Sequence, residues 1–83
     1  MTVTKFTAEW CGQCKSVNPI LKSAIEGLEV NFKEVDIDSN PDLASQYFIT
    51  KLPTIVVEEE GQELKRFLGL GNIGGLRNFL TQH

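Results

Sequence analysis

Hydrophobic and polar positions recur along the chain with the spacings of strands and helices. Residues 2–8 and 30–37 are rich in β-branched and aromatic side chains, which predicts two strands. Between them the apolar residues follow helical spacing and predict an amphipathic helix over 12–28: Val17, Ile20, Leu21, Ala24, Ile25 and Leu28. Pro19 lies inside this helix and removes a backbone donor, so we expect a kink near the second turn.

The second half of the chain predicts a short helix, a hairpin and a last helix. A capping side chain followed by Pro41 and Asp42 predicts a helix start at residues 39–42. Two strand-like runs, 53–57 and 62–68, flank a turn at Gly61. Apolar residues at helical spacing predict the last helix, whose first turn Gly74 and Gly75 should weaken: Ile73, Leu76, Phe79 and Leu80.

The predicted order is therefore βαβαββα, with a parallel half followed by an antiparallel hairpin. Such an order predicts an α/β fold in which helices cover both faces of a four-stranded mixed sheet. With 83 residues and no linker, we expect a single domain over residues 1–83.

Composition excludes several classes of function. The net charge is -3 and the densest charge run is acidic (residues 58–60), so we expect no nucleic-acid partner. No apolar stretch approaches the roughly 20 residues that cross a bilayer, and residues 1–3 lead into a strand rather than a leader. We therefore expect a cytoplasmic protein, where a close cysteine pair indicates redox or metal chemistry rather than scaffolding.

The two cysteines stand in the run Trp10-Cys11-Gly12-Gln13-Cys14, where a predicted strand ends and a helix begins. The unpaired N–H groups and the dipole of the helix start favour a thiolate at Cys11. Cys14 follows one turn later on the same face and should be more enclosed. We expect Cys11 to be the exposed attacking thiolate and Cys14 the sheltered resolving thiol.

The neighbours of the cysteines also suggest roles. Gly12 would let a substrate backbone approach, while Trp10 would either offer a flat apolar contact or pack half-buried. Two alternatives to redox catalysis stay open. A structural zinc site needs four ligands, and the only histidine is His83. A redox-silent binding module is the other.

Longer motifs resemble the thioredoxin family: Ala8 to Lys15 with Pro19, Asp36 to Pro41, Leu52-Pro53-Thr54 and Gly69. The resemblance covers nearly the whole chain, which lacks the strand and helix that usually open the family's fold. In this shortened form the chain is similar to compact thioredoxins and glutaredoxins. It implies a thiol–disulfide oxidoreductase that reduces protein disulfides through Cys11 and Cys14, without metal or organic cofactor. It also implies a monomer recycled by a thioredoxin reductase or similar donor, with ribonucleotide reductase as one candidate substrate.

By the same resemblance, Pro53 is the cis proline beside the disulfide. Trp10, Leu52, Pro53, Gly69 and Leu70 would form the substrate-docking surface; Leu70 could equally be a core residue.

The sequence departs from the family pattern at three places. Gln13 stands where most members have proline, and Thr7 replaces the usual first tryptophan. Lys5 occupies the position of a buried aspartate, and Glu34 that of its lysine partner. We predict a swapped, partly buried Lys5–Glu34 pair beneath Cys14; the alternative is that Lys5 reaches solvent.

A glutathione-dependent glutaredoxin is the alternative within the redox class. Its members usually carry a Pro-Tyr or similar pair between the cysteines, a Thr-Val-Pro before the cis proline, and a Gly-Gly-x-Asp near the last helix. This chain has Gly12-Gln13, Lys51-Leu52-Pro53 and Gly74-Gly75-Leu76-Arg77 instead. The pattern favours protein disulfides over glutathione mixed disulfides.

Overall fold

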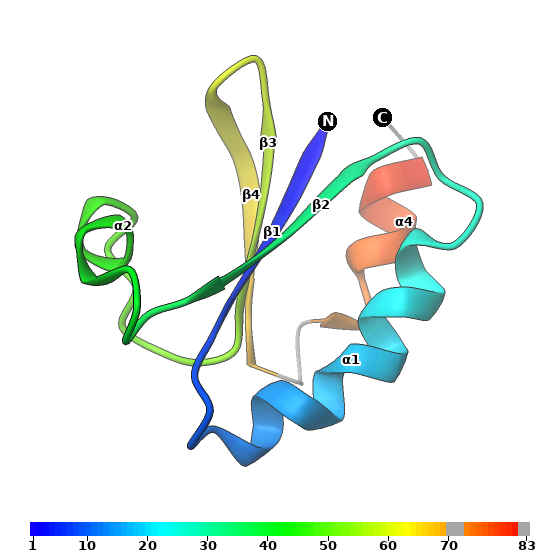
Figure 1. The fold of residues 1–83 in the computed structure, drawn as a ribbon. Coiled ribbons are helices and arrows are strands. Elements are labelled where there is room, and N and C mark those ends of the chain that lie inside the picture. The colour runs from blue at the N-terminus through cyan, green and yellow to red at the C-terminus, as the bar shows by residue number, and fades with distance from the viewer. Residues whose placement is uncertain (70–72, 82–83) are drawn as a thin grey trace.

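The computed structural model describes residues 1–69 and 73–81. Within these residues, four strands and three helices follow one another in the predicted βαβαββα order (Figure 1). Their bounds are β1 Thr2–Thr7, α1 Gly12–Ile25, β2 Asn31–Asp36, α2 Pro41–Gln46, β3 Thr54–Glu59, β4 Gln62–Leu68 and α4 Leu76–Thr81.

The strands form one mixed sheet in the order β2-β1-β3-β4. β1 pairs with β2 in parallel, in a register that places Lys5 opposite Glu34. β3 is antiparallel to both β1 and β4. The β3–β4 hairpin turns at Glu60 and Gly61, which have φ angles of 54° and 78°. A two-residue turn with both φ angles positive matches the twist of the flanking strands.

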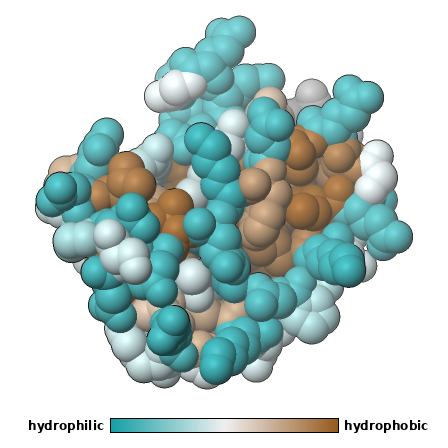
Figure 2. Space-filling view, viewed as in Figure 1, coloured by the Kyte–Doolittle hydropathy of each residue, from teal (hydrophilic) through white to brown (hydrophobic). Residues whose placement is uncertain are grey.

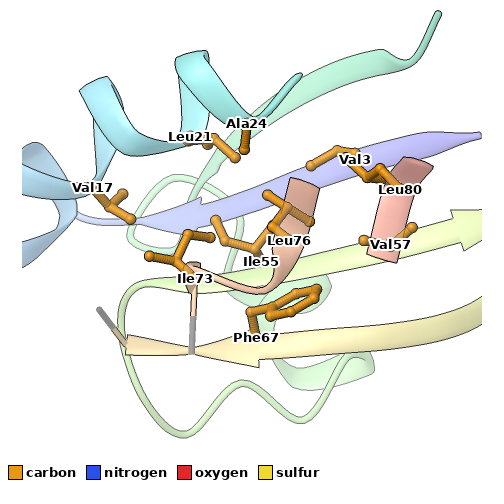
Figure 3. Packing of buried hydrophobic residues seen from close by; sticks show 10 residues of the cluster. All are labelled: Val3, Val17, Leu21, Ala24, Ile55, Val57, Phe67, Ile73, Leu76 and Leu80. Carbon is orange, nitrogen blue, oxygen red and sulfur yellow. The ribbon is translucent and has the colours of Figure 1, made fainter. Parts of the chain in front are cut away.

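Helices cover both faces of this sheet, which confirms the predicted fold class. Figure 1 shows α1 and α4 on one side of the sheet and α2 on the other. The main core lies between the sheet and the α1–α4 pair (Figure 3). Its buried members come from α1, the sheet and the C-terminal segment: Val3, Val17, Leu21, Ala24, Ile55, Val57, Phe67, Ile73, Leu76 and Leu80.

The opposite face is covered more thinly. No residue of α2 is buried, and Tyr47, the residue after the helix, contacts the sheet. The Tyr47 ring packs against Phe6 with centroids 5.2 Å apart, and its hydroxyl donates to both carboxylate oxygens of Glu58 at 2.9 and 3.0 Å. Glu58 of β3 is therefore linked to the residue that follows α2.

The helix limits differ slightly from the prediction. α1 ends at Ile25 rather than residue 28, because Gly27 adopts a φ of 79°, outside the helical region. Pro19 lies inside α1, whose ribbon changes direction along its length in Figure 1, as the proline predicts. α4 begins at Leu76, after the two glycines that were expected to weaken its first turn.

Some apolar surface remains open between the sheet and the helices, where Figure 2 shows brown surface facing the viewer. A groove of about 340 Å³ between α1 and the edge strand β2 has Leu21, Ile25 and Phe32 in its lining. None of the helices in residues 1–69 and 73–81 has the length and apolar character needed to cross a membrane.

Candidate active site

The cysteine pair lies where the chain leaves β1 and enters α1. The backbone N–H of Cys11 donates to the carbonyl of Ala8 at 3.1 Å, which closes a tight turn between the two elements. Cys11 is the N-cap residue of α1, and its Sγ accepts a hydrogen bond from the backbone N–H of Cys14 at 3.2 Å. The two sulfurs form a disulfide across a Cα–Cα distance of 5.3 Å.

Cys11 is more enclosed than the sequence predicted. Cys14 is fully buried, as expected, but Cys11 is only 7% exposed, so our expectation of an exposed Cys11 is wrong for this oxidised state. The disulfide turns the Cys11 sulfur toward Cys14, and Ala8, Ile37 and Leu52 pack against the pair. The order of accessibility is nevertheless the predicted one.

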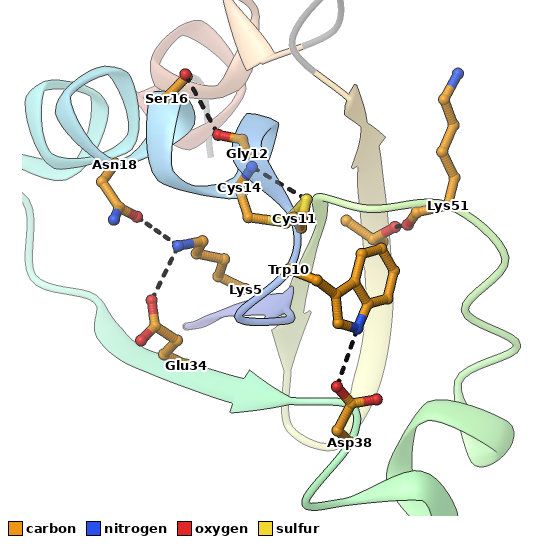
Figure 4. The surroundings of a disulfide bond; sticks show 11 residues. Lys5, Trp10, Cys11, Gly12, Cys14, Ser16, Asn18, Glu34, Asp38 and Lys51 are labelled. Atoms are coloured by element: carbon orange, nitrogen blue, oxygen red, sulfur yellow. Dashed lines mark hydrogen bonds and ion pairs between the residues drawn. A yellow bond between two sulfur atoms is a disulfide. The ribbon is translucent and has the colours of Figure 1, made fainter.

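Trp10 is largely in solvent, with 69% of its surface exposed. Its indole N–H donates to Asp38 Oδ2 at 3.0 Å, which holds the ring beside the disulfide (Figure 4). This exposure excludes the half-buried packing interpretation. The sequence analysis gave Asp38 no role of its own, although it lies in the Asp36 to Pro41 motif. It follows β2 directly, at the same end of the parallel pair β1–β2 as Trp10.

The segment before β3 supplies the second side of the site. The Leu52–Pro53 peptide bond is cis, as the family resemblance implied, and Leu52 packs against the cysteines. Gly69 has a φ of 68°, and its backbone N–H donates to the Pro53 carbonyl at 2.8 Å. The start of β3 and the end of β4 are thereby joined at the site. Leu70, also predicted to dock substrate, lies outside the described residues.

Gly12 and Gln13 begin α1 and are both exposed. A Cβ atom at Gly12 would meet nothing within 4 Å, so no contact within the described residues requires a glycine there. This free space is compatible with the predicted approach of a substrate backbone.

Behind the cysteines, the structure brings Lys5 and Glu34 together. Lys5 is 2% exposed, and its Nζ lies 2.9 Å from Glu34 Oε2, so it does not reach bulk solvent. The same ammonium donates to Asn18 Oδ1 on α1 (Figure 4). Asn18 was missed by the sequence analysis, although its position four residues after Cys14 places both on one helix face.

No group of three or more histidine, cysteine, aspartate or glutamate side chains within residues 1–69 and 73–81 is arranged to hold a metal ion. His83, the remaining ligand of the zinc alternative, lies outside those residues.

A cysteine pair lies at the start of the helix of a βαβ unit, in contact with the residue that precedes a cis proline. This arrangement defines the class of thiol–disulfide oxidoreductases with a thioredoxin-like fold. The sequence model of the family "Thioredoxin" matches residues 1–82. The thioredoxin of Chlamydia trachomatis is 37% identical over 84 residues, covering all of this chain and 82% of that protein. The thioredoxin of Mycoplasma pneumoniae is 47% identical over 68 residues, which are 81% of this chain and 67% of that protein.

Solved structures agree with the sequence relatives. Oxidised mitochondrial thioredoxin 3 of Saccharomyces cerevisiae superimposes with a TM-score of 0.87 and 32% identity, over 99% of this chain and 77% of that one. The chain belongs to the thioredoxin family. It is a protein-disulfide oxidoreductase that acts on disulfide-bonded proteins and depends on a reductase as electron donor, and the glutaredoxin, zinc and redox-silent alternatives are not favoured.

Proposed function

We propose that the protein reduces protein disulfides with Cys11 as the nucleophile and Cys14 as the resolving thiol. The observation that carries this assignment is the hydrogen bond from the Cys14 N–H to Cys11 Sγ, because a helix N-terminal donor stabilises a thiolate better than a thiol. Cys14 has no exposed surface, so a bulky substrate disulfide meets Cys11 first.

The reaction then has two exchange steps. The Cys11 thiolate attacks one sulfur of the substrate disulfide, forming a mixed disulfide and releasing the other substrate sulfur as a thiolate. Cys14 loses its proton and attacks Cys11 Sγ, which breaks the mixed disulfide and releases the second substrate thiolate. Two electrons have passed to the substrate, and the Cys11–Cys14 disulfide remains. These steps need no metal or organic cofactor.

Substrate docking is assigned to the surface around the disulfide. Trp10 supplies an exposed aromatic face, and Gly12 leaves room for a substrate backbone. Leu52, Pro53 and Gly69 form the opposite side, with Leu70 following directly in the chain. Gln13, exposed between the cysteines, replaces the proline of most family members and would influence the redox potential.

For the cellular setting we propose a cytoplasmic monomer that a thioredoxin reductase recycles. Ribonucleotide reductase is one candidate substrate, because it is a substrate of the family. Support for this setting comes only from the family relationship.

Trapping with a Cys14→Ser variant tests the function. Without the resolving thiol, the Cys11 mixed disulfide should persist, so protein substrates should accumulate as dithiothreitol-sensitive adducts in a lysate. Cys11→Ser is the matched control and should trap nothing. Turnover of the wild type should be sustained by a thioredoxin reductase rather than by glutathione with its reductase; the reverse result would return the assignment to the glutaredoxin alternative.

A further inference from the structure

A buried lysine behind the cysteine pair has no part in the two exchange steps as written above. Lys5 lies in the middle of β1, is 2% exposed, and is held by Asn18 of α1 and Glu34 of β2. Both partners are on exposed positions and reach inward to the ammonium (Figure 4). A buried charge is costly to desolvate, and here two polar side chains compensate for that cost by accepting hydrogen bonds from the ammonium.

The cluster lies next to the resolving cysteine. Asn18 follows Cys14 by one helical turn, which places the two Cβ atoms about 5–6 Å apart on one face of α1. Asn18 in turn accepts a hydrogen bond from the Lys5 ammonium. Ala8, three residues beyond Lys5, packs directly against the cysteines. The positive charge is therefore close to the sulfur that must lose a proton in the second step.

The ion-pair partner of Lys5 offsets its charge only in part. The Glu34 side chain is 52% exposed, so water screens its carboxylate, whereas the ammonium is enclosed. The other charged side chains lining the polar pocket of about 310 Å³ beside Lys5 are Glu9, Lys15 and Asp36. From the other neighbouring strand, the residue opposite Lys5 is the uncharged Ile55.

We propose that Lys5, held in place by Asn18 and Glu34, stabilises the Cys14 thiolate during resolution of the mixed disulfide. The inference rests on the proposed function, in which Cys14 resolves. Glu34 is a positioning residue and not the proton acceptor, because its carboxylate accepts a hydrogen bond from the Lys5 ammonium. The Cys14 proton passes to solvent or buffer, and the thiolate then attacks Cys11 Sγ.

A series of variants separates a proton acceptor from an electrostatic role. Glu34→Gln raises the charge of the cluster by one, so the pH midpoint of resolution should fall. Asn18→Asp and Lys5→Met each lower the charge by one, so the midpoint should rise, by about one pH unit or more for Lys5→Met. Below the midpoint, one unit is a tenfold slower resolution. If Glu34 were the proton acceptor, Glu34→Gln would instead slow resolution and raise the midpoint.

The measurement uses stopped-flow mixing of the reduced protein with an aromatic disulfide whose thiolate product is coloured, from about pH 5 to about pH 10. The first release of colour reports attack by Cys11, and the second reports resolution by Cys14. Cys14→Ser should retain only the first phase. A missing first phase would contradict the proposed function, whereas an unmoved second phase in the charge variants would contradict only the role of Lys5.

Two matched controls change a charge elsewhere, one in β2 and one at the β3–β4 hairpin. Lys33 is next to Glu34 in β2 but lines the pocket that contains Tyr47. Lys33→Met therefore removes one positive charge, as Lys5→Met does, from the other face of the strand. Glu59→Gln removes one negative charge, as Glu34→Gln does, from an exposed carboxylate at the hairpin. Neither should move the second phase. Asn18 and Glu34 are exposed, so their variants keep the test decisive even if Lys5→Met does not fold. A midpoint that rises in Glu34→Gln, or stays unchanged in both Glu34→Gln and Asn18→Asp, overturns the inference.

Discussion

The backbone N–H of Cys14 donates a hydrogen bond to Cys11 Sγ, so the sulfur of the first cysteine caps the helix that carries the second. An N-cap acceptor satisfies one of the N–H groups that the first turn of a helix leaves unpaired. When the disulfide is reduced, we expect the same N–H to stay directed at Cys11 and to stabilise its thiolate. This relationship makes the two chemically similar thiols unequal.

We therefore predict that Cys11 is alkylated before Cys14. Limited iodoacetamide treatment of the reduced protein at neutral pH, followed by peptide mapping, should find the label on Cys11, since only thiolates react quickly. Unfolding in urea removes the helix start and should equalise the two rates. Preferential label on Cys14 in the folded protein would reverse the assignment of roles.

The reduction potential should lie between about -270 mV, as in thioredoxin, and about -200 mV, near the glutaredoxins. Gln13 does not fix φ at the helix start as proline does, so the first turn is less constrained than in most of the family. Equilibration with glutathione buffers measures the potential, and Gln13→Pro should move it toward the lower value. A wild-type potential near -120 mV would instead identify a dithiol oxidant.

Tyr47 is the only tyrosine, so its ionisation can be followed directly by ultraviolet absorbance. Burial raises the pKa of Tyr47, and the hydrogen bond to Glu58 raises it further. We expect Glu58→Gln to lower the titration midpoint, with Glu59→Gln as an unchanged control. Because the folded pKa exceeds the unfolded value of about 10, this contribution to stability is complete below that pH and disappears as the pH rises through the folded pKa. An equal midpoint in Glu58→Gln and wild type would show that Glu58 does not affect the phenol.

Gly69→Ala should destabilise the fold by about 1 kcal/mol, because the φ of 68° is unfavourable for a residue with a Cβ. Crowding adds little, since the nearest atom to the new methyl group would be Lys51 Cε at 3.8 Å. Urea denaturation measures the loss. Gly12→Ala, at the first helical position with open space around it, is the control and should be neutral or slightly stabilising. Equal stability of both variants would contradict the strain at Gly69.

Lys5 and Glu34 should also be coupled in stability. A double-mutant cycle with Lys5→Met and Glu34→Gln should show that the second change costs less once the first is made. Because half of the Glu34 side chain is in water, we expect a coupling below about 1 kcal/mol. Strict additivity in urea denaturation would mean that the ion pair adds nothing to the stability of the fold.

Much of this protein could be predicted from the sequence because the signals are local. The period of the apolar residues in α1 determines which face of the helix packs on the sheet. The positive φ angles of Glu60 and Gly61 fit a two-residue hairpin turn. The spacing of Cys11 and Cys14 alone places both on one face of a helix start. These properties depend only on residues a few positions apart.

Tertiary structure decided what depends on residues that are distant in the chain. The 7% exposure of Cys11 follows from packing of Ile37 and Leu52, and the orientation of Trp10 depends on Asp38 at the end of another strand. The surroundings of Lys5 depend on the β1–β2 register together with the rotation of α1, which directs Asn18 at the ammonium. A strand register and a helix rotation are settled by packing of the whole core, so no local pattern in the sequence carries them.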